Sequence, residues 1–266
     1  MKVGIAGFGA IGRPVATALD NGIEGLELAA VCVRDTEKAQ RNMQGVCKPI
    51  PVLNASEMAE MCDIIVECAP KAAFREIAEP AINASRKLVT VSGAGLLENY
   101  DLVELAKKKN TQITLATGAL LGLDAVRAAA EGVIHEVRMI TRKPPNSLMG
   151  APHLEQNQIE LTGLSKPLKV FEGNATEGAR GFPANVNVAA ALGLAGVGPD
   201  NTILEIWADP ALQRNTHSIE VEADSARLKF SIENVPSEEN PGTGKITALS
   251  VIATLRALTI PLRVGT

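Results

Sequence analysis

The chain begins with a short apolar run that leads directly into a glycine-rich turn, and this feature limits its fold more than any other. Val3 to Ala6 has the composition of a β-strand, and Gly7-Phe8-Gly9-Ala10-Ile11-Gly12 follows it at once. A helical pattern then runs from about residue 10 to residue 21. A strand, a Gly-x-Gly-x-x-Gly turn and a helix in this order are typical of the first unit of a dinucleotide-binding α/β fold.

The three glycines of this turn are expected to have different tasks. The first allows the tight turn, the second removes a Cβ where a pyrophosphate must approach the backbone, and the third lets helix and strand pack closely. The N-terminal N–H groups and dipole of the helix favour the diphosphate. The alternative is an ordinary strand-to-helix turn that happens to be rich in glycine. We predict cofactor contacts from five residues, which are Gly7, Gly9, Ala10, Ile11 and Gly12.

The first half of the chain alternates short apolar runs with helical patterns. Strands are predicted at 26–33, 63–68, 87–91 and 112–116, with helices near 36–43, 71–84 and 98–109. This alternation predicts βαβ units and a doubly wound parallel sheet of the Rossmann type. Residues are 46% hydrophobic but only 3% aromatic, so small aliphatic side chains must fill the layers between sheet and helices.

The pattern changes after residue 117. A helix is predicted at 123–131 and a strand at 133–142, and residues 218–232 alternate between apolar and polar side chains. Such alternation predicts antiparallel strands with one face in water. The predicted fold is therefore α/β, a Rossmann domain followed by a second α+β domain with a mostly antiparallel sheet. The expected domains are 1–117 for the dinucleotide, 118–243 for substrate and dimerisation, and 244–266, a C-terminal helix that returns to the first domain.

The end of the second predicted strand bears on the choice between NAD and NADP. Arg34 and Asp35 follow it, where a carboxylate would bind the adenosine ribose and an arginine would favour a 2′-phosphate. The alternative is a solvated pair that caps the next helix. Because both chemistries are present, we predict that NAD and NADP both bind.

Charge and composition exclude several other kinds of partner. The net charge is −4 without a long basic run, so neither nucleic acid nor an acidic membrane surface is expected. No apolar run reaches the length of a membrane span, and the first residues lack the features of a signal peptide. The cysteines form no Cys-x-x-Cys pair and are expected to be reduced packing residues, namely Cys32, Cys47, Cys62 and Cys68. We expect a cytoplasmic protein with a small-molecule ligand.

Several strings in the second half resemble the L-aspartate dehydrogenase family, and the resemblance covers essentially the whole chain. The strings are Ala116-Thr117-Gly118-Ala119, Gly122-Leu123-Asp124-Ala125, Thr141-Arg142-Lys143-Pro144-Pro145, Phe182-Pro183-Ala184-Asn185-Val186-Asn187-Val188-Ala189-Ala190, Ala208-Asp209-Pro210, Asn215-Thr216-His217 and Asn240-Pro241. The chain departs from the family at Ala223-Asp224-Ser225-Ala226, where a turn with glycine is expected, and at Gly242 and Gly244, where Lys and Ser are more usual.

The resemblance implies the oxidation of L-aspartate to iminoaspartate with NAD or NADP. The imine then feeds quinolinate and pyridine nucleotide biosynthesis, or hydrolyses to oxaloacetate and ammonia. The resemblance also implies that His217 is the catalytic histidine and that Ala119 and Asn187 contact the cofactor.

The pattern around His217 agrees with a site but does not require one. His217 shares strand parity with Ile219 and Val221, and a lone histidine on an apolar face is commonly a core residue. Oxidation of an amine requires a proton to leave the ammonium group, and an imidazole that titrates near neutrality suits this transfer. We therefore assign His217 as the general base, or as the group that positions water for imine hydrolysis. His135 and His153 are expected to be structural or exposed, and no metal site is expected.

Other polar residues are weaker candidates. Asn185 and Asn187 stand at the start of an Ala-rich helix, where an amide can cap the helix or face the nicotinamide carboxamide. Aspartate carries two carboxylates, and Arg142 and Lys143 are the nearest basic candidates to bind them, although such residues at a strand end are commonly solvated. Ala119 is expected to lie beside the nicotinamide ring or to form a tight bend.

Three alternatives remain open. The chain can be a homoserine-dehydrogenase-like or a dihydrodipicolinate-reductase-like oxidoreductase, or a non-catalytic NAD(P)-binding regulatory protein that is indifferent to His217. The predicted sheet of the second domain has one face in water, which also offers a surface where two copies of the chain can associate, and we predict a homodimer.

Overall fold

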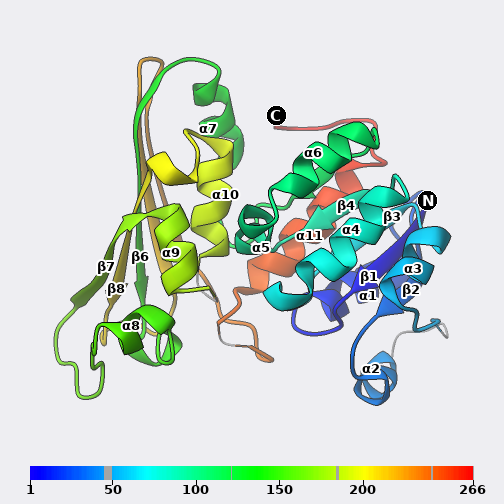
Figure 1. Ribbon diagram of the computed structural model, residues 1–266, viewed down its shortest axis with the longest axis horizontal. Coiled ribbons are helices and arrows are strands. Elements are labelled where there is room, and N and C mark those ends of the chain that lie inside the picture. Colours follow the sequence, from blue (N-terminus) through cyan, green and yellow to red (C-terminus); the bar gives the residue numbers. More distant parts are fainter. Residues whose placement is uncertain (45–49, 121, 184–185, 241, 266) are drawn as a thin grey trace. The chain divides into compact units, whose positions relative to one another are not determined.

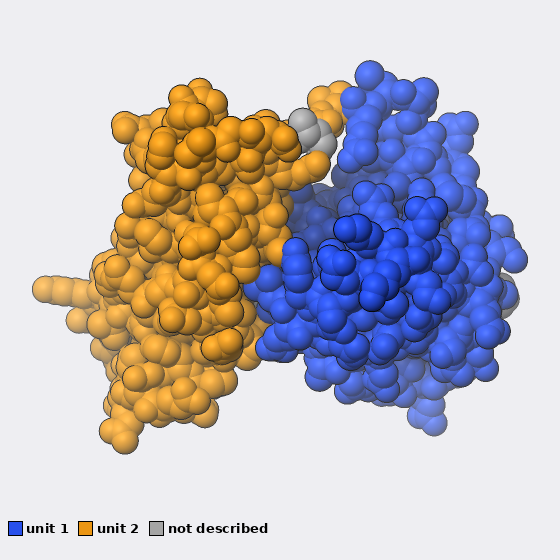
Figure 2. Space-filling model, turned by 45° about the horizontal axis from the view of Figure 1, so that its top comes forward, with its two compact units in different colours: residues 1–118, 247–263 blue, residues 119–246, 264–266 orange. Residues whose placement is uncertain are grey.

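The chain is divided into two compact units, each with its own sheet and core (Figures 1 and 2). The computed structural model describes residues 1–44, 50–120, 122–183, 186–240 and 242–265. Unit 1 contains residues 1–118 and 247–263, and unit 2 contains residues 119–246 and 264–266. Cys47 and Asn185 lie outside the described residues. Among the helices of the described residues, none has both the length and the apolar character needed to cross a bilayer.

Unit 1 is built on a parallel five-stranded sheet with the order β2-β1-β3-β4-β5. Its strands are β1 (Lys2–Ala6), β2 (Glu27–Cys32), β3 (Ile64–Glu67), β4 (Lys87–Thr90) and β5 (Ile113–Leu115). Its helices are α1 (Gly12–Asp20), α2 (Thr36–Met43), α3 (Ala55–Met61), α4 (Phe74–Asn83), α5 (Gly93–Glu98), α6 (Asp101–Lys108) and most of α11 (Lys245–Ala257), and a 3-10 turn (Lys71–Ala73) precedes α4. All four residues of β3 are buried, as expected for a parallel strand covered on both faces.

The core of unit 1 joins segments from both ends of the sequence. Val15 of α1 and Val251 and Leu255 of α11 are fully buried in one cluster with Ile5 of β1. Each fully buried Val, Leu or Ile side chain contributes about 1.5–3 kcal/mol relative to an exposed one. The C-terminal helix is thus a structural part of the dinucleotide-type unit.

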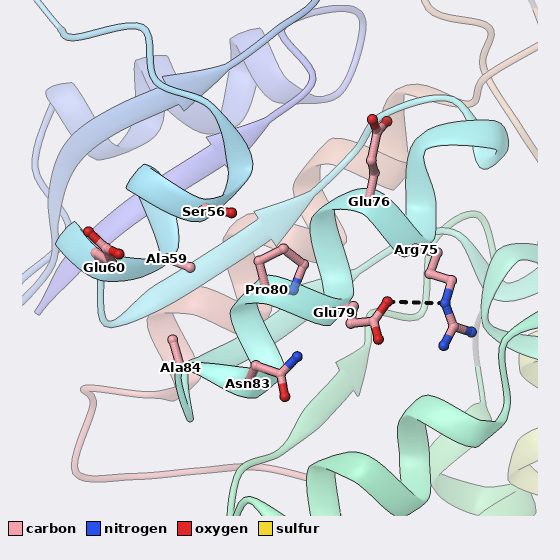
Figure 3. Close-up of a pocket in the computed structure, with 9 residues that line it drawn as sticks. All are labelled: Ser56, Ala59, Glu60, Arg75, Glu76, Glu79, Pro80, Asn83 and Ala84. Atoms are coloured by element: carbon pink, nitrogen blue, oxygen red, sulfur yellow. Dashed lines mark hydrogen bonds and ion pairs between the residues drawn. The ribbon is translucent and has the colours of Figure 1, made fainter.

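The outer helices α3 and α4 leave a pocket of about 720 Å³ between them (Figure 3). Its lining residues are Ser56, Ala59, Glu60, Arg75, Glu76, Glu79, Pro80, Asn83 and Ala84. Arg75 Nε lies 3.1 Å from Glu79 Oε2 within this lining. The pocket contains none of the site residues predicted from the sequence.

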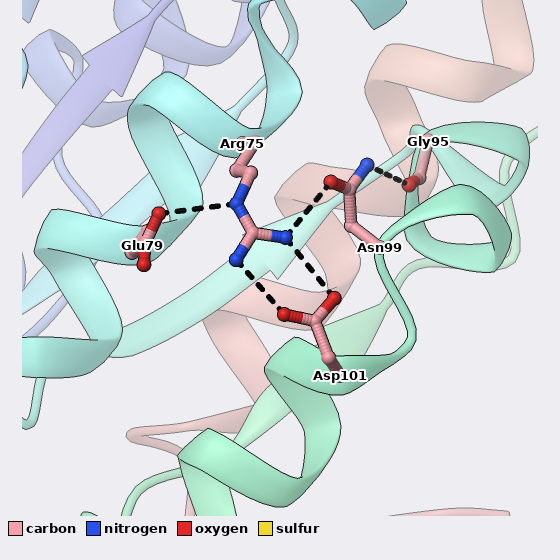
Figure 4. A network of polar contacts seen from close by, with 5 residues as sticks. All are labelled: Arg75, Glu79, Gly95, Asn99 and Asp101. Carbon is pink, nitrogen blue, oxygen red and sulfur yellow. Dashed lines mark hydrogen bonds and ion pairs between the residues drawn. The ribbon is translucent and has the colours of Figure 1, made fainter.

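Arg75 also connects α5 to the first turn of α6, the helix that the sequence predicted at 98–109 (Figure 4). Its Nη2 lies 2.8 Å from Asp101 Oδ2 in the first turn of α6, and its Nη1 donates to Asn99 Oδ1 at 3.3 Å. Asn99 Nδ2 donates to the Gly95 carbonyl at 2.9 Å and so binds the end of α5. These contacts hold the break at residues 99–100, and α5 itself was not predicted.

Unit 2 is built on a mixed five-stranded sheet with the order β10-β9-β6-β8-β7. Its strands are β6 (Ile134–Lys143), β7 (Leu168–Asn174), β8 (Thr202–Ala208), β9 (Thr216–Ala223) and β10 (Arg227–Glu233). Its helices are α7 (Leu123–Ala130), α8 (Pro152–Gln156), α9 (Ala175–Gly181) and α10 (Asn187–Ala195), with 3-10 turns at Pro145–Ser147 and Pro199–Asn201. Only β6 and β8 are parallel among its paired strands, and the other three pairings are antiparallel. The predicted fold class is confirmed.

The two faces of the unit 2 sheet differ in polarity. The labelled helices α7 to α10 lie on one side of the sheet (Figure 1), and alternate residues such as Met139, Leu204 and Ile219 are buried. The intervening residues carry ion pairs, including Arg138 Nη1 to Glu205 Oε1 at 2.9 Å and Lys229 Nζ to Glu220 Oε1 at 2.9 Å. The alternation of apolar and polar residues, which predicted one solvent-exposed face, thus corresponds to the apolar face and the ion-paired face of this sheet.

The cysteines in the described residues are unpaired. They are Cys32, Cys62 and Cys68. Cys62 is buried beside Gly4, and burial is the main cause that raises the pKa of its thiol to about 11. A thiol with this pKa is protonated at neutral pH and acts as a small packing group.

Candidate active site

Buried polar side chains concentrate at one place in each unit. In unit 1, Glu67, Thr90 and Ser92 lie at the carboxyl ends of neighbouring strands β3 and β4. In unit 2 the buried polar residues at one end of the sheet are Thr141, Lys143, Asp209, Asn215, His217 and Asn234. Because an interior normally excludes such groups, both clusters are candidates for function.

The glycine turn of unit 1 has the geometry that a pyrophosphate cradle requires. Gly7 has φ +91°, and a Cβ there would lie 2.6 Å from the Cys68 carbonyl oxygen. A Cβ on Gly12 would lie 1.9 Å from the Gly7 carbonyl oxygen. Gly9 is exposed, and a Cβ there would have no neighbour within 4 Å. Two glycines are therefore required by the fold, whereas the third leaves an open surface.

Helix α1 begins directly behind this open surface. Its N-cap residue Ile11 makes no side-chain capping bond, and its first turn contains no acidic residue. Ala10 and Ile11 are half-buried and line the entry to the helix. The positive end of the helix dipole is thus not neutralised by the chain's own carboxylates at this turn, and the residues present fit a diphosphate.

Arg34 and Asp35 are exposed residues at the carboxyl end of β2, next to β1 in the sheet. Asp35 Oδ1 accepts a hydrogen bond from the Lys38 backbone N–H at 2.9 Å and caps α2. Helix capping, which was the alternative to cofactor binding, therefore accounts for one carboxylate oxygen of Asp35. Both side chains lie where an adenosine ribose would be recognised in this fold.

Glu67 organises the loops behind the glycine turn and was missed by the sequence reasoning. Its Oε2 accepts from Thr90 Oγ1 at 2.6 Å, and its Oε1 accepts from the Ala69 N–H at 2.9 Å. Burial raises the pKa of Glu67, while the hydrogen bonds from Thr90, Ser92 and Ala69 lower it. The Cys68–Ala69 peptide packs against Gly7, so Glu67 holds the segment on which the turn rests. A glutamate at the end of an apolar strand was the only signal in the sequence.

His217 lies on β9 with its side chain on the buried face of unit 2. It is 3% exposed, and its Nδ1 lies 3.1 Å from Oγ1 of Thr141, its register partner on β6. Burial, and after it the charge of Lys143, lowers the pKa of His217 to about 3. The imidazole is therefore neutral throughout the physiological range. This differs from the expected titration near neutrality because desolvation penalises the charged ring.

Strand alternation separates the two basic residues predicted to bind the substrate. Lys143 is 3% exposed on the same face as Thr141, and burial lowers its pKa to about 8. Arg142 points to the other face, where its Nη1 lies 3.5 Å from Asp209 Oδ2 and its guanidinium lies 4.9 Å from the Trp207 ring centre. Lys143 therefore joins the His217 cluster, and Arg142 does not.

The two cofactor contacts implied by resemblance lie in unit 2. Ala119 is half-buried, and its carbonyl oxygen accepts a hydrogen bond from Asn234 Nδ2 at 3.3 Å. Asn187 is exposed and is the first residue of α10, whose N-cap residue is Val186 without a side-chain cap. Asn187 is therefore not the capping residue, and Asn185 lies outside the described residues.

The other two histidines lie away from this cluster. His135 is exposed. His153 lies 5.2 Å from the Phe171 ring and 5.3 Å from the Phe182 ring, measured between ring centres. These contacts give His153 a packing role.

Two family models together match nearly the whole chain. The model described as homoserine dehydrogenase, NAD binding domain, matches residues 7–116. The model described as aspartate dehydrogenase, C-terminal, matches residues 124–258, the segment that contains the His217 cluster. The two names differ in their substrate, and the aspartate name belongs to the half with the histidine.

Curated relatives and solved structures extend these matches. The chain is 56% identical to an L-aspartate dehydrogenase of Bradyrhizobium diazoefficiens, over 100% of this chain and 94% of the relative. It is 49% identical to L-aspartate dehydrogenase 3 of Bordetella bronchiseptica, over 100% of this chain and 98% of the relative. The crystal structure of an aspartate dehydrogenase from Thermotoga maritima has the same fold, with a TM-score of 0.76, 24% identity, and coverage of 100% of this chain and 99% of the other.

Proposed function

Because the chain belongs to the L-aspartate dehydrogenase family, we propose that it oxidises L-aspartate to iminoaspartate with NAD or NADP. The observation that carries this proposal is the buried group of His217, Thr141 and Lys143, which lies inside the segment matched by the aspartate dehydrogenase model. The group combines a neutral imidazole with a buried cation. These are the groups needed to accept a proton from an amine and to attract a carboxylate.

The dinucleotide is held by the backbone of the glycine turn, through Gly7, Gly9, Ala10, Ile11 and Gly12. The open surface at Gly9 and the uncapped start of α1 support this assignment. When bound, the nicotinamide supplies a hydride acceptor.

The two ends of the dinucleotide are assigned to different residues. Arg34 and Asp35 contact the adenosine ribose or its 2′-phosphate, and their exposure at the end of β2 allows both forms of the cofactor. Ala119 and Asn187 contact the nicotinamide half, as the family resemblance implies.

His217 accepts the proton that the substrate ammonium must lose before its α-carbon can release a hydride. In the tautomer that we propose, Nδ1–H donates to Thr141 Oγ1, 3.1 Å away, and the lone pair of Nε2 faces the substrate. The low pKa makes His217 a weak base by itself. A substrate carboxylate beside Lys143 offsets the charge of that residue, which is the smaller of the two causes, after burial, that lower this pKa, so substrate binding strengthens the base.

Lys143 is the proposed partner of a substrate carboxylate. It is buried on the same face as His217, and a charged lysine in such a place gains from an anionic ligand. Arg142 is half-exposed, lies on the opposite face beside Asp209, and is not assigned to the substrate.

The experiment is a measurement of nicotinamide reduction with a panel of amino acids and with each cofactor. Formation of NADH and NADPH with L-aspartate, and none with L-homoserine, is expected. Activity with homoserine alone would favour the homoserine-dehydrogenase-like alternative. Absence of turnover with every amino acid, together with dinucleotide binding, would favour a regulatory protein. In the active enzyme, His217→Ala is expected to lower kcat by about 10²–10⁴-fold.

We propose that the enzyme is a cytoplasmic homodimer and that its product feeds pyridine nucleotide biosynthesis. The unpaired cysteines of the described residues support a reducing compartment.

A further inference from the structure

The side-chain oxygen of Asn234 has no hydrogen-bond partner although it is buried. Asn234 follows β10 and is 4% exposed, and its Oδ1 is the one buried side-chain oxygen or nitrogen without a partner in the part of the chain that the structure describes. Buried amide oxygens nearly always accept a hydrogen bond, because loss of hydration is otherwise not compensated. An acceptor left without a donor in this way indicates a place for a ligand group.

The orientation of the Asn234 amide is fixed by its other contacts. Its Nδ2 donates to the Ala119 carbonyl at 3.3 Å, and its backbone N–H donates to the Asn215 carbonyl at 2.9 Å. A flipped amide would bring Oδ1 against the Ala119 oxygen, where two acceptors would repel each other. The free group is therefore the acceptor.

Gly244 keeps this oxygen uncovered by a neighbouring side chain. A Cβ at position 244 would lie 2.9 Å from Asn234 Oδ1 and 3.2 Å from its Cγ. Any larger residue at this position would therefore press on the amide.

Strand register places Asn234 in the His217 cluster. Ile232 of β10 is the register partner of His217, and the bond between Asn234 and Asn215 continues this ladder by two residues. Because side chains alternate along a strand, Asn234 shares the face of His217. Lys143 stands two residues after Thr141, the partner of His217 on β6, and so belongs to the same face.

We infer that Asn234 is a binding residue whose Oδ1 accepts a hydrogen bond from an N–H group of the reactants. The inference rests on the proposed function, in which two reactants carry such a donor. One is the α-ammonium group of L-aspartate, and the other is the carboxamide of the nicotinamide. The carboxylates of the substrate have only acceptor oxygens at neutral pH and are excluded from this position.

Two substitutions separate the acceptor from the contact with Ala119. Asn234→Asp and Asn234→Leu both remove the Nδ2 donor, but only Asn234→Leu also removes the acceptor oxygen. Asn201→Leu is the matched control, because Asn201 is exposed and also donates from Nδ2 to a carbonyl, that of Val197 at 3.1 Å. If Asn234→Leu fails to fold, Asn234→Ala removes the same two groups in a smaller side chain.

The readouts are the KM for L-aspartate at saturating cofactor and the calorimetric Kd for NAD⁺ without substrate. Asn234→Leu is expected to raise one of these constants about tenfold, and Asn201→Leu to stay within about threefold of wild type. Asn234→Asp is expected to lose less than Asn234→Leu, because it keeps the acceptor although its second oxygen opposes the Ala119 carbonyl. A change in KM alone identifies the ammonium group, and a change in Kd identifies the carboxamide.

Two results would overturn the inference. Equal losses of affinity in Asn234→Asp and Asn234→Leu would show that Asn234 only supports Ala119. Wild-type values of KM and Kd in both variants would show that Asn234 binds neither reactant. An inactive wild-type protein in the presence of L-aspartate would instead overturn the proposed function, and this inference with it.

Discussion

His217 and Lys143 lie on the same face of one sheet, and burial changes the pKa of both. The pKa of His217 is lowered to about 3 and that of Lys143 to about 8. For both bases the charged form is the one that loses hydration, so both shifts have the same direction. A substrate with two negative charges stabilises the charged forms that burial disfavours, and this couples substrate binding to proton transfer.

The pKa of His217 predicts how stability depends on pH. Its folded value of about 3 lies below the ordinary 6.5, so the unfolded chain binds the proton first as the pH falls. His217 therefore lowers the free energy of unfolding between pH 6.5 and pH 3. Relative to wild type, His217→Asn is expected to gain about 3 kcal/mol between pH 7 and pH 4. Urea titrations at several pH values measure this difference.

The control for this prediction is His135→Asn, because His135 is exposed. If His217→Asn followed the pH dependence of wild type, the buried, neutral state of the imidazole would be contradicted.

The sequence predicted some residues of the site and missed others for a physical reason. His217 was found through strand parity and resemblance. Glu67 and Asn234 were not found, because their partners Thr90 and Ala119 lie 23 and 115 residues away in the sequence. A buried polar residue can be recognised as part of a site only when the folded structure shows which residue lies next to it. The separation of Arg142 from Lys143 needed only the alternation of β6, which the sequence already carried.

At the scale of elements, the turn between β1 and α1 combines a structural and a functional requirement. Gly12 packs on the Gly7 carbonyl, and Gly9 faces open space. The same motif therefore contains one glycine that the fold needs and one that only a ligand needs.

A substitution at Gly9 is expected to change cofactor binding, whereas one at Gly12 is expected to change stability. Gly9→Val should leave the free energy of unfolding within about 0.5 kcal/mol of wild type and weaken NAD⁺ binding at least about tenfold by blocking the phosphates. Gly12→Ala should lower the free energy of unfolding by about 1–3 kcal/mol through overpacking. Thermal unfolding and calorimetry distinguish the two. An unchanged affinity of Gly9→Val for NAD⁺ would contradict the placement of the diphosphate at this turn.

The accuracy of the predicted elements followed the strength of local signals. Helix α2 begins and ends at the predicted residues, and Asp35, which directly precedes it, provides its N-cap. Helix α3 was missed although Asn54 and Glu57 form a capping box at its start, a signal that local reasoning can find. The break between α5 and α6 depends on Arg75, a residue of another helix, and no local pattern contains it.

At the scale of the whole molecule, the second sheet has an open polar face that bears on assembly. Arg138, Glu205, Glu220 and Lys229 form ion pairs on this face, and Trp207 Nε1 donates to Glu205 Oε2 at 2.9 Å. Arg138 and Trp207 on this face belong to the residue types that are enriched at interfaces between subunits.

We expect a homodimer in solution. Static light scattering should give a mass near twice the chain mass of 27.9 kDa. The mass is expected to stay constant between about 5 and 50 μM, as it does for a dimer whose Kd lies well below this range. A mass of one chain at these concentrations would contradict the dimer.

In the proposed reaction this chain takes a hydride from the α-carbon of L-aspartate. Transfer of deuterium from L-[2-²H]aspartate to the nicotinamide, followed by mass spectrometry of the reduced cofactor, tests this step. We expect one deuterium in each reduced cofactor molecule formed by the wild type and almost no labelled cofactor with His217→Ala. Reduced cofactor without deuterium, or labelled aspartate recovered unchanged with wild type, would contradict it.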